Sequence, residues 1–182
     1  PETYDYVKNL VKDLELPNAQ ALLSSGGKGE GFAKLDQSTQ NTIPDSESYM
    51  LMRLDSDDVL HPKTVDEFCR NASKENPIVG VNNGYKFNWR TGDIAIHYYK
   101  NSAFFGMLKF DKNLTFGDHG HTSIRYFYNN LNLINIPFVQ VYHNSNVRVG
   151  FSQEDKKLTG KDIQEFYDTY GIKWNRKLIN PT

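Results

Sequence analysis

Carboxylates are concentrated at one point of the chain, where Asp55-Ser56-Asp57-Asp58 directly follows the apolar run 49–54. The run predicts a buried strand, so the aspartates stand where that strand emerges into solvent. Ligands of open α/β sheets bind beyond the carboxyl ends of the strands, and closely spaced carboxylates repel one another unless a hard divalent cation neutralises them. The segment therefore predicts metal-assisted chemistry at one edge of a sheet.

A simpler explanation of the same segment is a solvated turn in which Asp58 caps the helix that follows. An EF-hand calcium loop is a poor fit, because neither the glycine nor the distal glutamate of that loop stands at the required offset. The metal site and the capping turn thus remain as the two alternatives.

The elements around the acidic segment are expected to form a strand, loop and helix unit. His61-Pro62 opens the helix, with proline at a favoured first position. Its apolar face is expected to carry Val65, Phe68, Cys69 and Ala72. Before the strand, periodicity predicts a helix over 2–15 and a short strand over 19–23, and the glycine-rich stretch 24–31 has no P-loop spacing and is interpreted as a surface loop.

Downstream, alternating apolar patterns predict strands over 78–89 and 94–99, joined by a hairpin turn at 90–93, and a further strand over 104–110. Helical spacing at Ile124, Phe127, Tyr128 and Leu131 predicts a helix whose entrance is 117–121. A buried strand over 136–142 should end just before His143. The final helix is expected to start near Thr159, with an apolar stripe of Ile163, Phe166, Tyr167 and Tyr170.

Length and composition limit the classes of protein that fit. The 182 residues suit a single α/β domain, 1–182, in which 150–182 forms a C-terminal helical extension. A net charge of -1 offers no broad field for nucleic acid, and no apolar run reaches membrane-spanning length. The single cysteine, Cys69, excludes a disulfide within the chain and favours a reducing compartment, so we expect a cytoplasmic protein. We also expect the protein to be bacterial.

The string Leu54-Asp55-Ser56-Asp57-Asp58-Val59-Leu60-His61-Pro62 resembles the Asp-x-Asp segment of GT-A-fold glycosyltransferases, particularly a large inverting family. The resemblance implies a GT-A-like, Rossmann-like mixed sheet flanked by helices. It also implies that Asp55 and the neighbouring Arg53 face the nucleotide of a nucleotide-diphosphate-sugar donor. Asp57 and Asp58 would then bind Mn²⁺ or Mg²⁺, which offsets the charge that develops on the departing diphosphate.

Two later segments extend the resemblance. The stretch 116–125 is similar to the element that carries the catalytic carboxylate, with Asp118 in place of the first acid and His119 in place of the second. Either side chain could accept the proton of a hydroxyl acceptor such as a glycan, and Asp118 is preferred; in the alternative, Asp118 caps its helix. His143 is similar to a further metal ligand of the family, and together with Arg53 this stretch resembles a group of rhamnosyltransferases.

The resemblance covers 19–149, and fewer strand-helix units precede Asp55 than the family would have, so the resemblance also implies an incomplete, N-terminally truncated domain. Competing functions are a haloacid-dehalogenase-type phosphatase with Asp55 as nucleophile, and a non-catalytic glycan-binding module. Some aromatic residues could form an acceptor-side wall or simply belong to the core: Trp89, Tyr98, Tyr99, Phe104 and Phe105.

Overall fold

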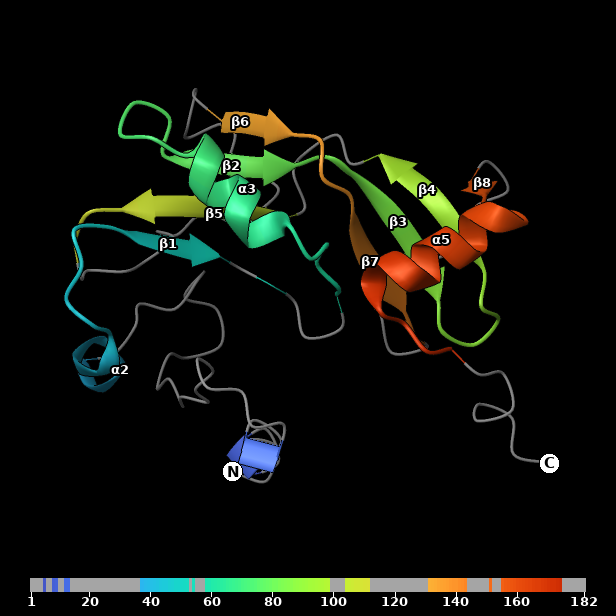
Figure 1. Cartoon of the computed structure of the whole chain (residues 1–182), viewed down its shortest axis with the longest axis horizontal. Helices are drawn as coiled ribbons and strands as arrows, with labels where there is room; N and C mark the ends of the chain where they lie inside the picture. The colour runs from blue at the N-terminus through green and yellow to red at the C-terminus, as the bar shows by residue number, and fades with distance from the viewer. Residues whose placement is uncertain are drawn as a thin grey trace.

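The computed structural model describes residues 5, 8–9, 12–13, 37–52, 54, 58–98, 104–111, 131–143, 151 and 155–174. These residues form a mixed α/β structure with two sheets that lie side by side along the long axis of the molecule (Figure 1). The expected α/β class is confirmed, but the described strands form two mixed sheets and not one.

The first sheet, sheet A, contains three parallel strands and one antiparallel strand in the order β1-β5-β2-β6. Its strands are β1 (Tyr49–Met52), β5 (Phe104–Lys109), β2 (Ile78–Val81) and β6 (Leu131–Ile134). Strand β5 runs antiparallel to both β1 and β2, and β2 runs parallel to β6. The carboxyl ends of β1, β2 and β6 therefore meet at one edge of the sheet.

The second sheet, sheet B, has the order β7-β3-β4-β8. Its strands are β7 (Phe138–Tyr142), β3 (Asn83–Asn88), β4 (Ile94–Tyr98) and β8 (Lys156–Lys157). The hairpin between β3 and β4 confirms the predicted turn at 90–93, in which Gly92 has a φ of 75°. Beyond the last helix, the indole N–H of Trp174 donates to the Trp89 carbonyl at 2.6 Å, and the Trp174 ring covers Gly92.

The two sheets share two stretches of chain. Strand β2 passes into β3 through Asn82 alone, and β6 passes into β7 through 135–137. Both pairs of strands are parallel, and Asn83 Nδ2 donates to Asn135 Oδ1 at 2.7 Å where the two stretches leave one sheet for the other. The predicted strand over 78–89 is thus divided between the two sheets.

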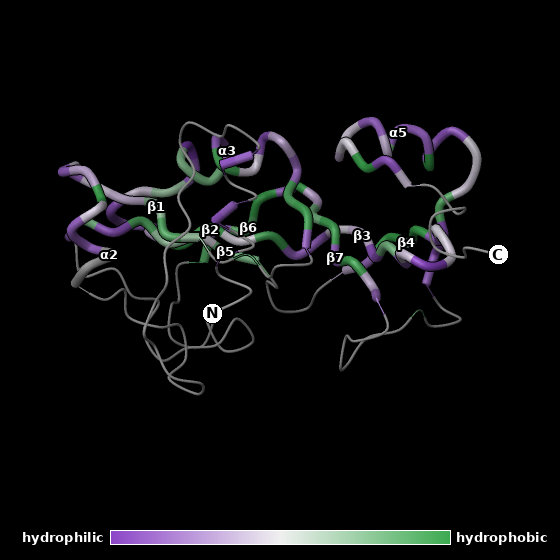
Figure 2. The backbone as a smooth tube through the Cα atoms, turned by 90° about the horizontal axis from the view of Figure 1, so that it is seen from below, coloured by the Kyte–Doolittle hydropathy of each residue, from purple (hydrophilic) through white to green (hydrophobic). Residues whose placement is uncertain are grey.

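Two helices lie on the same side of the sheets, one over each (Figure 2). Helix α3 (Thr64–Asn71) packs Phe68 on sheet A, in a cluster with Val79, Val81, Phe104 and Phe138. Helix α5 (Lys161–Tyr170) packs Phe166 on sheet B, in a cluster with Phe87, Ile94 and Val139. The stripe predicted for α5 is confirmed, since Ile163, Tyr167 and Tyr170 also join this cluster.

Several expectations need correction. Strand β1 is an edge strand and is half-buried, because only β5 pairs with it. Only Phe68 of the four apolar residues expected to face the sheet from α3 is fully buried, whereas Val65 and Cys69 are exposed. Leu131 was expected in a helix but begins β6, and the short helix α2 (Gln37–Thr42) was not expected.

Two further details differ from the sequence-based expectations. Helix α5 begins after Gly160, without a side-chain cap from Thr159. Of the aromatic residues considered for an acceptor wall, Phe104 and Phe105 are core residues, while Trp89 and Tyr98 are exposed. Tyr99 lies outside the described residues, as do 19–31 and the expected helix at 124–130. Within the described chain, no helix combines the length and the apolar character needed to cross a membrane.

Candidate functional site

The carboxyl edge of sheet A is where the acidic segment leaves β1. The chain reaches Val59, which forms an antiparallel bridge to Val139 of β7 through hydrogen bonds of 2.9 and 2.8 Å. Strand β7 is the edge strand of sheet B, so its outer backbone groups are available for this pairing. The bridge fixes the end of the acidic segment beside the neighbouring sheet.

Asp58, the residue before this bridge, is half-buried, and its charge acts on Tyr142, the last residue of β7. The Tyr142 side chain is buried, and its pKa is raised, first by burial and then by the charges of Asp155 and Asp58. The Tyr142 hydroxyl donates to Gln140 Oε1 at 3.4 Å.

The capping alternative for Asp58 is wrong, because α3 starts at Thr64 and its N-cap is Lys63. His143 immediately follows Tyr142 and is exposed, as expected for a residue just past a strand end. Asp58 precedes the residue that pairs with Val139, near the start of β7, and His143 follows the last residue of the same strand. Asp58 and His143 are the two predicted site residues that the structure describes, and whether they share a site stays a prediction.

The remaining predicted site residues lie outside the described part of the chain: Arg53, Asp55, Asp57, Asp118 and His119. Among the residues that are described, no three His, Cys, Asp or Glu side chains gather where they could hold a metal ion. The described part of the proposed metal site thus consists of Asp58 and His143 alone.

A buried ion pair adjoins Tyr142 and was missed by the sequence analysis. Lys86 Nζ contacts both carboxylate oxygens of Asp155 at 3.2 Å, and the two side chains are 6% and 9% exposed. Such burial is costly for each charge alone, so each depends on the other. The sequence offered little signal, because Lys86 stands between Tyr85 and Phe87 in a strand pattern and is therefore expected on the face opposite the aromatic residues, where a lysine is usually exposed to solvent.

Together these side chains form what we call the polar face of sheet B, the side opposite α5: Lys86, His97, Gln140, Tyr142 and Asp155. Lys86 is in register with Gln140 across β7, which sets both on one face. The pKa of His97 is lowered by burial and then by the Lys86 charge, while Asp155 acts in the opposite direction. The imidazole of His97 is therefore favoured in its neutral form beside this ion pair.

His61 is a further residue whose role at this edge the sequence did not reveal. The backbone N–H of Lys63 donates to its Nδ1 at 3.1 Å, which leaves the proton of the neutral ring on Nε2. Burial and then the Lys63 charge lower the pKa of His61, so the neutral ring is favoured. His61 lines an open cavity of about 550 Å³ beyond the end of β6, where Glu67, Asn71 and Asn135 also contribute.

The described geometry thus contains polar groups, an open cavity and the end of an acidic segment along the carboxyl edge of parallel strands. This is the edge at which open α/β sheets bind ligands. Comparisons with protein-family models, with curated proteins and with solved structures find no match for this chain.

Proposed function

We propose that this protein is a metal-dependent glycosyltransferase of GT-A type that moves a sugar from a nucleotide-diphosphate-sugar to a hydroxyl acceptor such as a glycan, with inversion preferred. The observation that carries the proposal is the place of the acidic string in the fold. The string follows β1, one of three parallel strands, and Val59, the residue after the string, pairs with Val139 of β7, the strand that leads into His143.

Each residue has a separate role in this proposal. Asp57, Asp58 and His143 hold Mn²⁺ or Mg²⁺, and Asp55 and Arg53 orient the nucleotide. When bound, the cation supplies charge stabilisation to the departing diphosphate. Asp118 removes the proton of the acceptor hydroxyl, with His119 as the alternative base. The half-buried position of Asp58 suits a metal ligand, because a cation would offset the repulsion between it and the neighbouring carboxylates.

The test is calorimetric titration of the full chain with a panel of nucleoside diphosphates, with and without Mn²⁺. We expect binding to at least one nucleotide that requires the metal, and a loss of about tenfold or more in metal affinity for Asp57→Asn. Asp66→Asn is the matched control, because Asp66 lies on the exposed side of α3 and should leave binding unchanged.

Absence of metal-dependent nucleotide binding would overturn the proposal. Trapping of an aspartyl-phosphate at Asp55 would instead favour the phosphatase, and glycan binding that is independent of metal and nucleotide would favour the binding module.

A further inference from the structure

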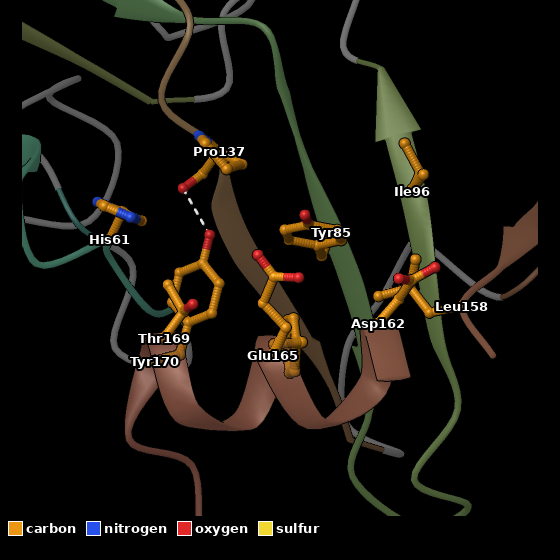
Figure 3. Close-up of a pocket in the computed structure, with 10 residues that line it drawn as sticks. His61, Tyr85, Ile96, Pro137, Leu158, Asp162, Glu165, Thr169 and Tyr170 are labelled. Atoms are coloured by element: carbon orange, nitrogen blue, oxygen red, sulfur yellow. Dashed lines mark hydrogen bonds between the residues drawn. The ribbon is translucent and has the colours of Figure 1, made fainter. Parts of the chain in front are cut away.

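A second cavity lies between α5 and sheet B, on the side away from the polar face (Figure 3). Its volume is about 340 Å³, which is in the range of small-molecule sites. Helix α5 contributes one wall, Tyr85 and Ile96 of sheet B another, and His61 lies at the end away from Ile96.

Two carboxylates give this cavity its charge. Asp162 and Glu165 are three residues apart on α5, so both face the same side of the helix, and Figure 3 shows Glu165 directed between Tyr85 and Tyr170. The pKa of Tyr85 is raised by burial and then by the charges of Glu165 and Asp162. Neither carboxylate forms an ion pair with a described residue.

The remaining lining does not offset these charges. No lysine or arginine is among the described residues that line the cavity, and His61 is favoured in its neutral form. The chain as a whole carries a net charge of only -1, so the negative potential of the cavity arises locally. A ligand that enters is therefore selected for positive charge.

Aromatic rings supply the body of the site. Tyr85 and Phe166 pack edge to face at 5.2 Å, and Tyr170 lies 5.1 Å from Phe166. The Tyr170 hydroxyl donates to the Pro137 carbonyl at 2.8 Å, which holds this ring in place. Ile96 is 46% exposed beside these rings. The rings and the aliphatic side chain suit a ligand with a partly apolar body. The carboxylates suit a cationic group on that ligand, and the faces of aromatic rings also attract cations.

We propose that this cavity binds a ligand in which a primary ammonium group is carried on a body about the size of one sugar ring, of which an amino sugar is the simplest example. The ammonium group lies between Asp162 and Glu165, and the ring packs against Tyr85 and Tyr170. The proposal concerns binding alone, needs neither metal nor nucleotide, and does not depend on the transferase function.

The test is a heteronuclear NMR titration of the full chain with glucosamine, N-acetylglucosamine and glucose at neutral pH and low salt, without metal or nucleotide. We expect glucosamine to shift the amide signals of α5 and β3, with an affinity that falls as salt is added. N-acetylglucosamine and glucose have the same ring without the charge, and each should bind about tenfold more weakly.

Two single variants and one control localise the effect. Glu165→Gln and Asp162→Asn should each weaken glucosamine binding about three- to fivefold, as expected for loss of one exposed ion pair. Asp168→Asn is the control, because Asp168 is on the same helix but accepts a hydrogen bond from Gln164 and does not line the cavity. The amide spectrum of each variant reports whether it is folded.

Equal binding of the charged and uncharged sugars, unchanged binding by both α5 variants, or no shift with glucosamine would each overturn the proposal. Equal binding by n-butylamine would overturn the assignment of a ring-sized body. None of these outcomes bears on metal-dependent nucleotide binding, so failure here is distinct from failure of the proposed transferase.

Discussion

Sheets A and B share two stretches of chain, 78–88 and 131–142, but the side chains that they bury differ. All four residues of β2 are buried, and apolar clusters lie on both faces of sheet A. Sheet B has apolar residues under α5 and the Lys86–Asp155 ion pair on its other face. The change occurs within a few residues, at Asn82 and at 135–137, where the chain passes between the sheets.

This difference suggests that the two sheets have different structural roles. Sheet A supplies an apolar base and the edge from which the acidic segment leaves, whereas sheet B holds charged and titratable side chains on its polar face. Apolar burial stabilises without directional demands, while a buried charge is tolerated only with a partner in good geometry. The two sheets should therefore respond differently to substitution.

The largest effect is expected at the ion pair of sheet B. Asp155→Ala leaves the Lys86 ammonium buried without its partner and should lower the free energy of unfolding by about 3–5 kcal/mol, measured by urea denaturation. Asp93→Asn is the matched control within the same sheet, because its pair with Lys157 is exposed, with side chains 39% and 52% accessible. That substitution should cost at most about 1 kcal/mol. Equal losses in the two variants would contradict the distinction.

An intermediate effect is expected where glycines allow close packing. A Cβ at Gly84 of sheet B would collide with the backbone carbonyl of Phe138, whereas a Cβ at Gly106 of sheet A would lie 2.6 Å from Phe68 Cδ2 and 2.9 Å from Met50 Sδ. Side chains can move more easily than backbone. Both alanine variants should lose about 1–3 kcal/mol, with Gly84→Ala the more destabilised. Thermal denaturation of the two variants side by side tests this order, which a greater loss for Gly106→Ala would reverse.

The smallest effect concerns the pH dependence that the polar face contributes. Burial and Lys86 lower the pKa of His97 below its ordinary 6.5, so the unfolded chain binds the proton more readily. The contribution of His97 is complete above pH 6.5 and is lost as the pH falls from there toward its folded-state pKa. His97→Gln should reduce the fall in stability between about pH 7.5 and about pH 5.5.

Burial and a nearby lysine charge also lower the pKa of His61. The variant His97→Gln should therefore keep part of the dependence of stability on pH, and the double variant His61→Gln/His97→Gln should keep less of it. Urea denaturation at the two pH values measures this. If the free energy of unfolding of the double variant depends on pH as strongly as that of the unchanged protein, folding does not favour the neutral form of either imidazole.

Local patterns were sufficient for part of the fold. The turn at 90–93, strand β5 and the stripe of α5 follow from alternation or helical spacing over a few residues. The passage from β2 to β3 was not predictable, because Asn82 interrupts an otherwise continuous strand pattern. Leu131 was placed in a helix because the four apolar residues at 124–131 have helical spacing, and the pairing with β2 that makes it a strand residue is remote in sequence.

The same distinction applies to the site. The acidic segment is visible in the sequence because its residues are adjacent. The pairing of Val59 with Val139 places the residue after this segment beside β7, and the Lys86–Asp155 pair joins residues 69 positions apart. Long-range pairings of this kind depend on the assembled sheets, and no local periodicity encodes them.

The contact between Trp174 and Trp89 has a practical consequence. The chain contains two tryptophans, and one donates its indole N–H to the carbonyl of the other at the hairpin of sheet B. Both intrinsic fluorophores therefore sit at the same junction, where the segment after α5 meets the hairpin. Their fluorescence emission therefore reports whether this segment is docked on the hairpin. The described strands of sheet A contain no tryptophan and do not contribute to this signal.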